Sequence, residues 1–204
     1  MERLTNNDIK VVLFDLGRVL MHIDFDAFPH KLGLTTKEQR APYEMVVKKI
    51  NHLYECGKMT TKEFLDALHP VFEGRFTREQ ILDAYDSIIV EDNQDIIPFV
   101  HSVREKYTIA ILSNTSPSHW KKILRVSSVV RLFSNTFTSF QLGAMKPSPV
   151  VYKKVCKSLN VKPHEIIFID DLKENIEGAI ASGMIGIVYD NLEQLKKIET
   201  LKIK

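Results

Sequence analysis

The chain has little of what marks secreted, membrane-spanning or nucleic-acid-binding proteins. It carries two cysteines in 204 residues, Cys56 and Cys156, in no Cys-X-X-Cys pattern, which excludes a disulfide framework and favours packing roles in a reducing compartment. No apolar run approaches the roughly 20 residues of a membrane span, and the polar start over residues 1–8 is unlike a signal peptide. The chain has 28 basic and 26 acidic residues and a net charge of +2, so it lacks the strong positive potential that would attract nucleic acid or an anionic membrane. We therefore expect a cytoplasmic protein that binds neither.

The chain does contain polar residues that follow apolar stretches. In chain order these are Asp15 after 11–14, Ser113 and Asn114 after 109–112, Lys146 after 137–140, and Asp170 and Asp171 after 166–169. If the stretches are parallel strands, the polar residues share the crevice outside the carboxyl ends of those strands. Carboxylates are the hard oxygen ligands that Mg2+ prefers, and a lysine beside a serine suits a phosphoryl group. The pattern predicts phosphoryl transfer.

The order of these motifs resembles the haloacid dehalogenase-like hydrolase superfamily over nearly the whole chain. The resemblance implies that Asp15 is a nucleophile that forms an aspartyl-phosphate, and that Ser113 and Lys146 are the catalytic residues that bind the phosphoryl group. It also implies an Mg2+ site made by Asp15, the backbone carbonyl of Gly17, Asp170 and Asp171, and leaves open whether Asp170 ligates directly or through water. We further expect Arg18 and Asn114 to bind substrate, which would be a small phosphorylated metabolite.

One position departs from the family pattern. Most phosphatases of the superfamily carry a second aspartate two residues after the nucleophile, where this chain has Gly17. That aspartate is the general acid/base, a role typically worth about 10² to 10⁴ in rate. Its absence favours an easy leaving group such as the anomeric oxygen of a sugar 1-phosphate, and segment 15–25 is similar to a subgroup that includes glucose-1-phosphate phosphatases. His22 and Asp24 are candidate substitutes for the missing acid.

Other functions of the same residues are less favoured. A 2-haloacid dehalogenase uses the same nucleophile without a metal and usually lacks the acidic pair at 170–171, and a sugar-phosphate mutase relies on the acid/base that Gly17 replaces. A receiver-type phosphoacceptor domain has its acidic pair before the phosphorylated aspartate, which is the reverse of this order. A non-catalytic chain that binds a phosphometabolite or a protein would not need to keep Asp15.

The pattern after residue 92 predicts an α/β fold, a Rossmann-like parallel sheet core with helices on both faces. With 11–14, the expected strands are 108–113, 135–139, 165–170 and 185–189, and the expected helices are 95–105, 118–124, 148–159, 173–182 and 191–201. Gly183 is expected to end one helix in a left-handed conformation. Asp170 or Asp171 could be the N-cap of the helix that begins near Lys173, and Asn175 is expected to orient the acidic loop.

A long helical insertion separates the first two motifs. Three capping boxes mark helix starts in it, namely Thr36 with Gln39, Thr60 with Glu63, and Thr77 with Gln80. We interpret residues 22–92 as a small helical cap and residues 1–21 and 93–204 as the catalytic core. Because the core motifs bind only the phosphoryl group, the cap should select the organic part of the substrate, and the resemblance points to segment 52–58. His119 and Trp120 could also line the pocket, and we expect a monomer or a weak homodimer.

Overall fold

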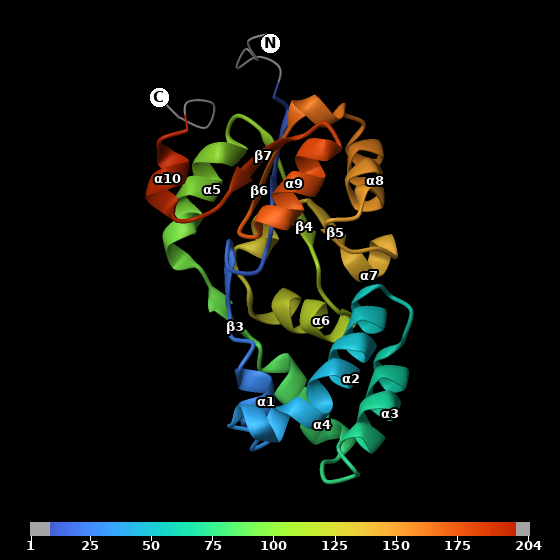
Figure 1. Cartoon of the computed structure of the whole chain (residues 1–204). Helices are drawn as coiled ribbons and strands as arrows, with labels where there is room; N and C mark the ends of the chain where they lie inside the picture. The colour runs from blue at the N-terminus through green and yellow to red at the C-terminus, as the bar shows by residue number, and fades with distance from the viewer. Residues whose placement is uncertain (1–8, 199–204) are drawn as a thin grey trace.

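A five-stranded parallel sheet forms the centre of the molecule (Figure 1). The computed structural model describes residues 9–198. The strands are β1 (Val11–Phe14), β4 (Thr108–Ser113), β5 (Asn135–Thr138), β6 (Ile166–Asp170) and β7 (Ile185–Val188), in the order β5-β4-β1-β6-β7. Every neighbouring pair runs parallel, which confirms the predicted fold class. Residues 1–8 and the end of the predicted last helix at 199–201 lie outside the described residues.

Helices cover both faces of the sheet. The longer ones are α5 (Ile97–Arg104), α6 (Pro117–Val126), α8 (Pro149–Leu159) and α9 (Lys173–Ala181). The short ones are α7 (Ser139–Leu142), α10 (Leu192–Lys196) and the 3-10 turns η1 (Gln94–Ile96), η2 (Val130–Leu132) and η3 (Pro163–Glu165). Along β1, Val12 and Phe14 pack with α5, α6 and α10, whereas Val11 and Leu13 pack with α8 and α9. A strand buried on both faces needs apolar residues at every position, which explains its continuous apolar sequence.

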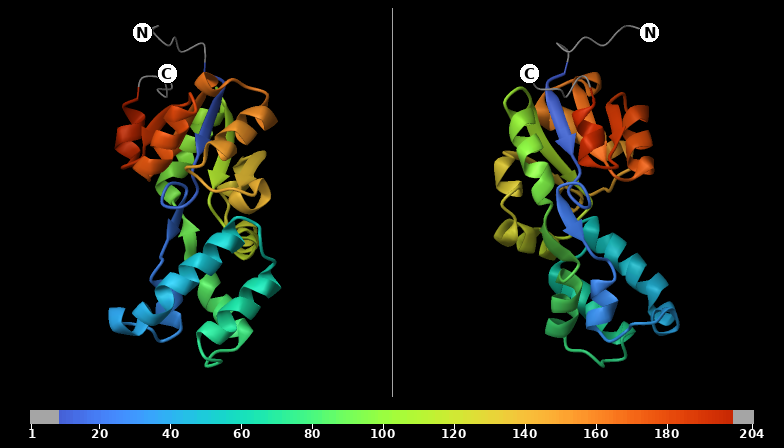
Figure 2. Two further views of the ribbon diagram at one scale, coloured as in Figure 1. Left: turned by 45° about the vertical axis from the view of Figure 1, so that its right-hand side comes forward. Right: turned by 90° about the vertical axis from the view of Figure 1, so that its left-hand side faces the viewer.

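The strand order reverses direction at the middle of the sheet. Strand β1 is central, and the chain continues to β4 on one side of it and β6 on the other. In such sheets ligands bind outside the carboxyl ends of the strands, next to the point where the order reverses. Both views in Figure 2 show the carboxyl end of β1 directed toward a second group of helices.

This second group contains α1 (Ala27–Lys31), α2 (Lys37–Glu55), α3 (Thr61–Val71) and α4 (Arg78–Asp86). The four helices enclose an apolar cluster of their own that includes Tyr54, Phe64, Phe72 and Tyr85. All three predicted capping boxes are confirmed, with both hydrogen bonds of each box present. The bounds 22–92 for a cap domain remain our proposal for this part of the chain.

An antiparallel strand pair connects the cap helices to the core. It consists of β2 (Met21–Ile23) and β3 (Ile89–Asp92), at the two ends of the insertion. The sequence predicted helices alone between 22 and 92, and this expectation was wrong for both segments. Strands of three and four residues are too short for alternation to be visible, so the pairing depends on contacts between distant segments.

Candidate active site

A buried lysine joins two of the predicted acidic residues. Lys146 Nζ lies 2.5 Å from Asp15 Oδ1 and 2.7 Å from Asp170 Oδ2. The lysine side chain is 1% exposed and that of Asp170 is 0% exposed, so the charges are compensated almost entirely within the protein. Removing one partner from such a buried arrangement typically destabilises by about 3–5 kcal/mol, because the other charge is left uncompensated. The ends of β1 and β6 are thus tied to the loop that precedes α8.

The carboxylate of Asp170 is held in place by its own loop. Asn175 Nδ2 lies 3.0 and 3.1 Å from the two carboxylate oxygens, which confirms the expectation that it orients the acidic loop. The backbone N-H of Leu172 donates to Asp170 Oδ1 at 2.8 Å. The expectation that Asp170 or Asp171 caps α9 was wrong: Leu172 occupies the N-cap position and makes no side-chain cap bond. Asp170 instead belongs to β6, and its side chain faces the lysine.

Three carboxylates converge near this lysine. Asp15, Asp170 and Asp171 each offer an oxygen, and these atoms lie within 4.8 Å of one another. The donor set consists of hard oxygens, which is the chemistry that suits Mg2+. Gly17, whose carbonyl is the other predicted ligand, lies in the turn after β1, where Arg18 N donates to Met21 O at 2.7 Å.

The electrostatics of the cluster favour an additional positive charge. Burial and the neighbouring Asp170 raise the pKa of Asp15 to about 6, although Lys146 opposes this. Burial and Asp170 also raise the pKa of Asp171. Burial lowers the pKa of Lys146, but the two carboxylates outweigh burial and the net pKa is raised, so the lysine stays charged at neutral pH. A bound cation would bring both raised carboxyl pKa values down.

Asn114 joins the two loops that were predicted to bind phosphate. Its side-chain amide donates to Lys146 O at 3.0 Å and its carbonyl accepts from Lys146 N at 2.8 Å. Ser113, the last residue of β4, is buried beside it. The structure therefore gives Asn114 a contact that the sequence did not indicate: both ends of its amide position the lysine backbone.

Arg18 lies at the rim of the cluster in an unusual backbone conformation. Its φ angle is +60°, in the left-handed region that a non-glycine residue rarely adopts. Its guanidinium lies 3.7 Å from Asp171 Oδ2 and 5.1 Å from the centre of the Phe25 ring. The side chain is 54% exposed, which leaves most of its donors open to a ligand.

The candidate substitutes for the missing acid are both exposed. His22 is exposed on β2, between the inward-facing Met21 and the half-buried Ile23. Asp24 is exposed and its Oδ1 accepts from Asp26 N at 2.9 Å, so it stabilises the turn before α1. A role of either residue in proton transfer remains a prediction.

The cap contacts the core through aromatic residues. The Tyr85 ring stacks on the His119 imidazole with centroids 4.0 Å apart, and His119 Nε2 lies 2.9 Å from Tyr85 O. Tyr54 Oη accepts from Ser118 N at 3.1 Å, at the start of α6. Trp120, by contrast, packs in the core cluster. The sequence singled out His119, but its stacking partner could not be identified from local pattern.

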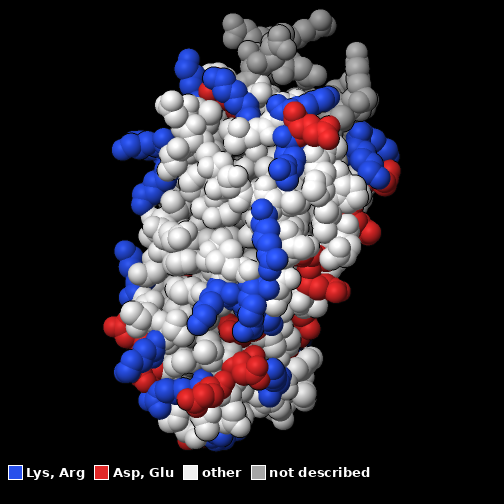
Figure 3. Space-filling view, turned by 180° about the vertical axis from the view of Figure 1, so that it is seen from behind, with Lys and Arg blue, Asp and Glu red and all other residues white. Residues whose placement is uncertain are grey.

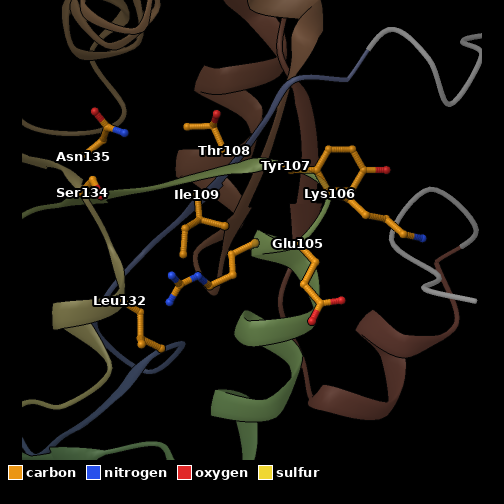
Figure 4. A pocket seen from close by; sticks show the side chains of 9 residues that line it. Glu105, Lys106, Tyr107, Thr108, Ile109, Leu132, Ser134 and Asn135 are labelled. Atoms are coloured by element: carbon orange, nitrogen blue, oxygen red, sulfur yellow. The ribbon is translucent and has the colours of Figure 1, made fainter.

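A hollow elsewhere on the molecule does not contain the predicted residues (Figure 4). Its volume is about 400 Å³, and residues 104–109 line it together with Leu132, Ser134 and Asn135. Thr108 and Ile109 begin β4, so this hollow lies at the opposite end of the strand from Ser113. Seen from behind, the surface carries basic and acidic side chains interspersed with each other (Figure 3). Within residues 9–198, the helices are all too short or too polar to cross a membrane.

Comparison with known proteins gives consistent matches. The family model for a haloacid dehalogenase-like hydrolase matches residues 9–183. D-ribitol-5-phosphate phosphatase of Bacteroides thetaiotaomicron is 29% identical over 177 residues, which cover 82% of this chain and 85% of that protein. The crystal structure of a HAD family enzyme from the same organism, in complex with magnesium and inorganic phosphate, superposes with a TM-score of 0.79 at 26% identity over 92% of this chain and 98% of that one.

A more distant structure shares only the fold. L-2-haloacid dehalogenase from Xanthobacter autotrophicus has a TM-score of 0.65 at 17% identity, over 93% of this chain and 81% of that one. The family model covers most of the chain and includes Asp15, Ser113 and the acidic pair at strand ends, and Lys146 in the loop between α7 and α8. The chain therefore belongs to the haloacid dehalogenase-like hydrolase family.

Proposed function

We propose that this enzyme is a Mg2+-dependent phosphatase that hydrolyses a small phosphorylated sugar or polyol through an aspartyl-phosphate on Asp15. The observation that carries the proposal is the meeting of Asp15, Lys146 and Asp170 at hydrogen-bond distance, with Asp171 in the same cluster. The related enzyme with bound magnesium and phosphate supports it. The site lies where the family motifs converge, at the carboxyl ends of β1 and β6.

The chain's own residues account for the chemistry of phosphoryl transfer. Asp15 attacks phosphorus in line, so that a bond forms from its carboxylate oxygen as the bond to the leaving oxygen breaks. Lys146 and Ser113 stabilise the transferring group, and Asn114 holds the lysine backbone in position. Mg2+, held by Asp15, the Gly17 carbonyl, Asp170 and Asp171, would supply positive charge to the phosphoryl oxygens.

A water molecule then hydrolyses the aspartyl-phosphate and regenerates Asp15. Because Gly17 carries no acid/base, positioning and charge must supply most of the acceleration. Sugar 1-phosphates suit such a site, since the anomeric oxygen leaves easily. The related ribitol-5-phosphate phosphatase makes terminal phosphates of polyols the other group to test. We assign Arg18, half-exposed at the rim, to negative charge on the substrate.

The test is phosphate release from p-nitrophenyl phosphate, sugar 1-phosphates and terminal sugar or polyol phosphates, with and without Mg2+. Asp15→Asn should abolish release, whereas Asp83→Asn, which removes a carboxylate 70% exposed on α4, should leave it unchanged. Wild-type rates in Asp15→Asn would end the nucleophile assignment. Chloride release from 2-chloropropionate without phosphate release would establish the dehalogenase alternative instead.

A further inference from the structure

Helices α8 and α9 lie next to each other on one face of the sheet, and each begins beside a part of the active site (Figure 1). Helix α8 begins at Pro149, shortly after Lys146, and α9 begins at Lys173, shortly after Asp171. The packing of the two helices therefore determines how the lysine loop lies relative to the acidic loop.

A buried tyrosine of α8 makes a polar contact between the two helices. Tyr152 is 0% exposed, and its hydroxyl donates to the backbone carbonyl of Asn175 at 2.7 Å. Burial, followed by the charges of Asp170 and Asp15, raises the pKa of Tyr152, so the hydroxyl remains a donor at neutral pH. A buried hydroxyl without a partner is unfavourable, so this hydrogen bond fixes the tyrosine and the first turn of α9 relative to each other.

The asparagine that accepts this hydrogen bond also holds a predicted metal ligand. The side-chain amide of Asn175, itself 3% exposed, lies 3.0 and 3.1 Å from the two carboxylate oxygens of Asp170. One of these oxygens also lies 2.7 Å from Lys146 Nζ. A continuous series of hydrogen bonds thus runs from the Tyr152 hydroxyl through Asn175 to the carboxylate that contacts the lysine.

A glycine in α9 allows the two helices to approach this closely. A Cβ atom at Gly178 would lie 2.7 Å from Pro147 O, 2.9 Å from Pro147 Cβ and 3.2 Å from Tyr152 Cε2. Glycine in a helix interior is less favourable than alanine, so its presence in α9 needs a reason, and the nearby backbone of Pro147 supplies one. Because Pro147 directly follows Lys146, α9 packs against the lysine loop itself.

We propose that Tyr152 is a positioning residue for the metal site, acting through Asn175 to fix the carboxylate of Asp170. The inference rests on the proposed function for the identity of the cation, Mg2+. A carboxylate that the protein already holds in the right orientation binds a cation more tightly than one that must first be ordered. Gly178 contributes to the same arrangement, because it keeps α9 close to the lysine loop.

The experiment measures Mg2+ binding by isothermal titration calorimetry of the metal-free protein, so the result does not depend on turnover. Tyr152→Phe removes only the hydroxyl and should raise the Kd for Mg2+ at least about threefold. Gly178→Ala displaces α9 by a different means and should also raise it at least about threefold. The control is Val100→Ala, a fully buried position of α5 on the opposite face of the sheet, which should lower Tm and leave the Kd unchanged.

A double-mutant cycle tests the route through the asparagine. Asn175→Ala should itself weaken Mg2+ binding, because it removes the amide that holds Asp170. Adding Tyr152→Phe to Asn175→Ala should change the Kd by less than about 1.5-fold, since the side chain that transmits the effect is already absent. A tyrosine that only stabilised the fold would instead lower Tm in both backgrounds and leave the Kd unchanged in each.

The outcomes separate this inference from the proposed function. An unchanged Kd in Tyr152→Phe, or the same fold-change with and without the Asn175 side chain, would overturn the inference while the phosphatase function stands. If Tyr152→Phe does not fold, an unchanged Kd in Gly178→Ala overturns it instead. Absence of phosphate release from a wild type that binds Mg2+ would overturn the proposed function alone. A wild type that binds no Mg2+ would overturn both.

Discussion

His119 should make the stability of the enzyme depend on pH in the weakly acidic range. The imidazole is 5% exposed and lies between Tyr85 of the cap and the core. Its Nε2 must donate to Tyr85 O, because a carbonyl can only accept, so in the neutral ring Nδ1 carries no proton. Burial lowers its pKa from 6.5 to about 4, although the hydrogen bond to Tyr85 O favours the protonated form.

The sign and size of the effect follow from this pKa. Between pH 6.5 and about 4 the unfolded chain binds a proton at His119 that the folded chain does not, so the free energy of unfolding falls as the pH falls. Above pH 6.5 this loss is absent. Protonation of His119 in the unfolded chain lowers the free energy of unfolding by about 2 kcal/mol at pH 5 and by roughly 3 kcal/mol at pH values below both pKa values.

The assay is urea unfolding at pH 7.5 and pH 5, followed by the fluorescence of Trp120, the chain's single tryptophan and the next residue. His119→Gln is the comparison, since its amide can still donate to Tyr85 O but does not titrate. The wild type should lose about 2 kcal/mol more than the variant between the two pH values. Contributions from the carboxylates cancel in this difference. Equal losses in the two proteins would refute the reasoning.

Three further substitutions test other parts of the structure. Gly17→Asp should raise turnover of alkyl phosphates by up to about 10², because it restores an acid/base, whereas Gly17→Asn should not. A Cβ atom at position 17 would lie 3.3 Å from Ile23 Cγ1, so either side chain requires a shift of a few tenths of an ångström. Asp171→Asn should raise the Mg2+ concentration for half-maximal activity at least about tenfold, and an unchanged Mg2+ titration would count against it as a ligand. Gly57→Ala should destabilise by about 1–3 kcal/mol, because its Cβ would clash with Phe140 O; a Tm equal to the wild type would disprove that contact.

The sequence predicted the sheet well because buried parallel strands have a distinct pattern. Strands β1, β4 and β6 are continuous apolar runs, and a polar residue ends each run where the strand reaches the crevice. The capping boxes were equally visible, since both partners of each lie within three residues. Features that depend on local pattern were therefore accessible before the structure.

Features that depend on long-range contacts were not accessible. The pairing of β2 with β3 joins segments more than 60 residues apart. The Asn114 side chain forms its hydrogen bonds with the backbone of Lys146, which lies 32 residues further along the chain. The order of the motifs along the chain predicted that Asp15, Lys146 and Asp170 come together, but not that Asn114 holds the backbone of Lys146 in place.

The charges of the site explain why a buried lysine accompanies a predicted metal site. Asp15, Asp170 and Asp171 contribute three negative charges and Lys146 one positive charge, which leaves −3 + 1 = −2 within the cluster. A divalent cation balances this remainder, whereas without the lysine the three carboxylates would repel one another and bind protons instead. Arg18, half-exposed at the rim, is a further positive group, which we propose meets the substrate. Under the proposed function, the lysine keeps Asp15 ionised in a buried site and, together with the cation and Arg18, stabilises the phosphoryl group.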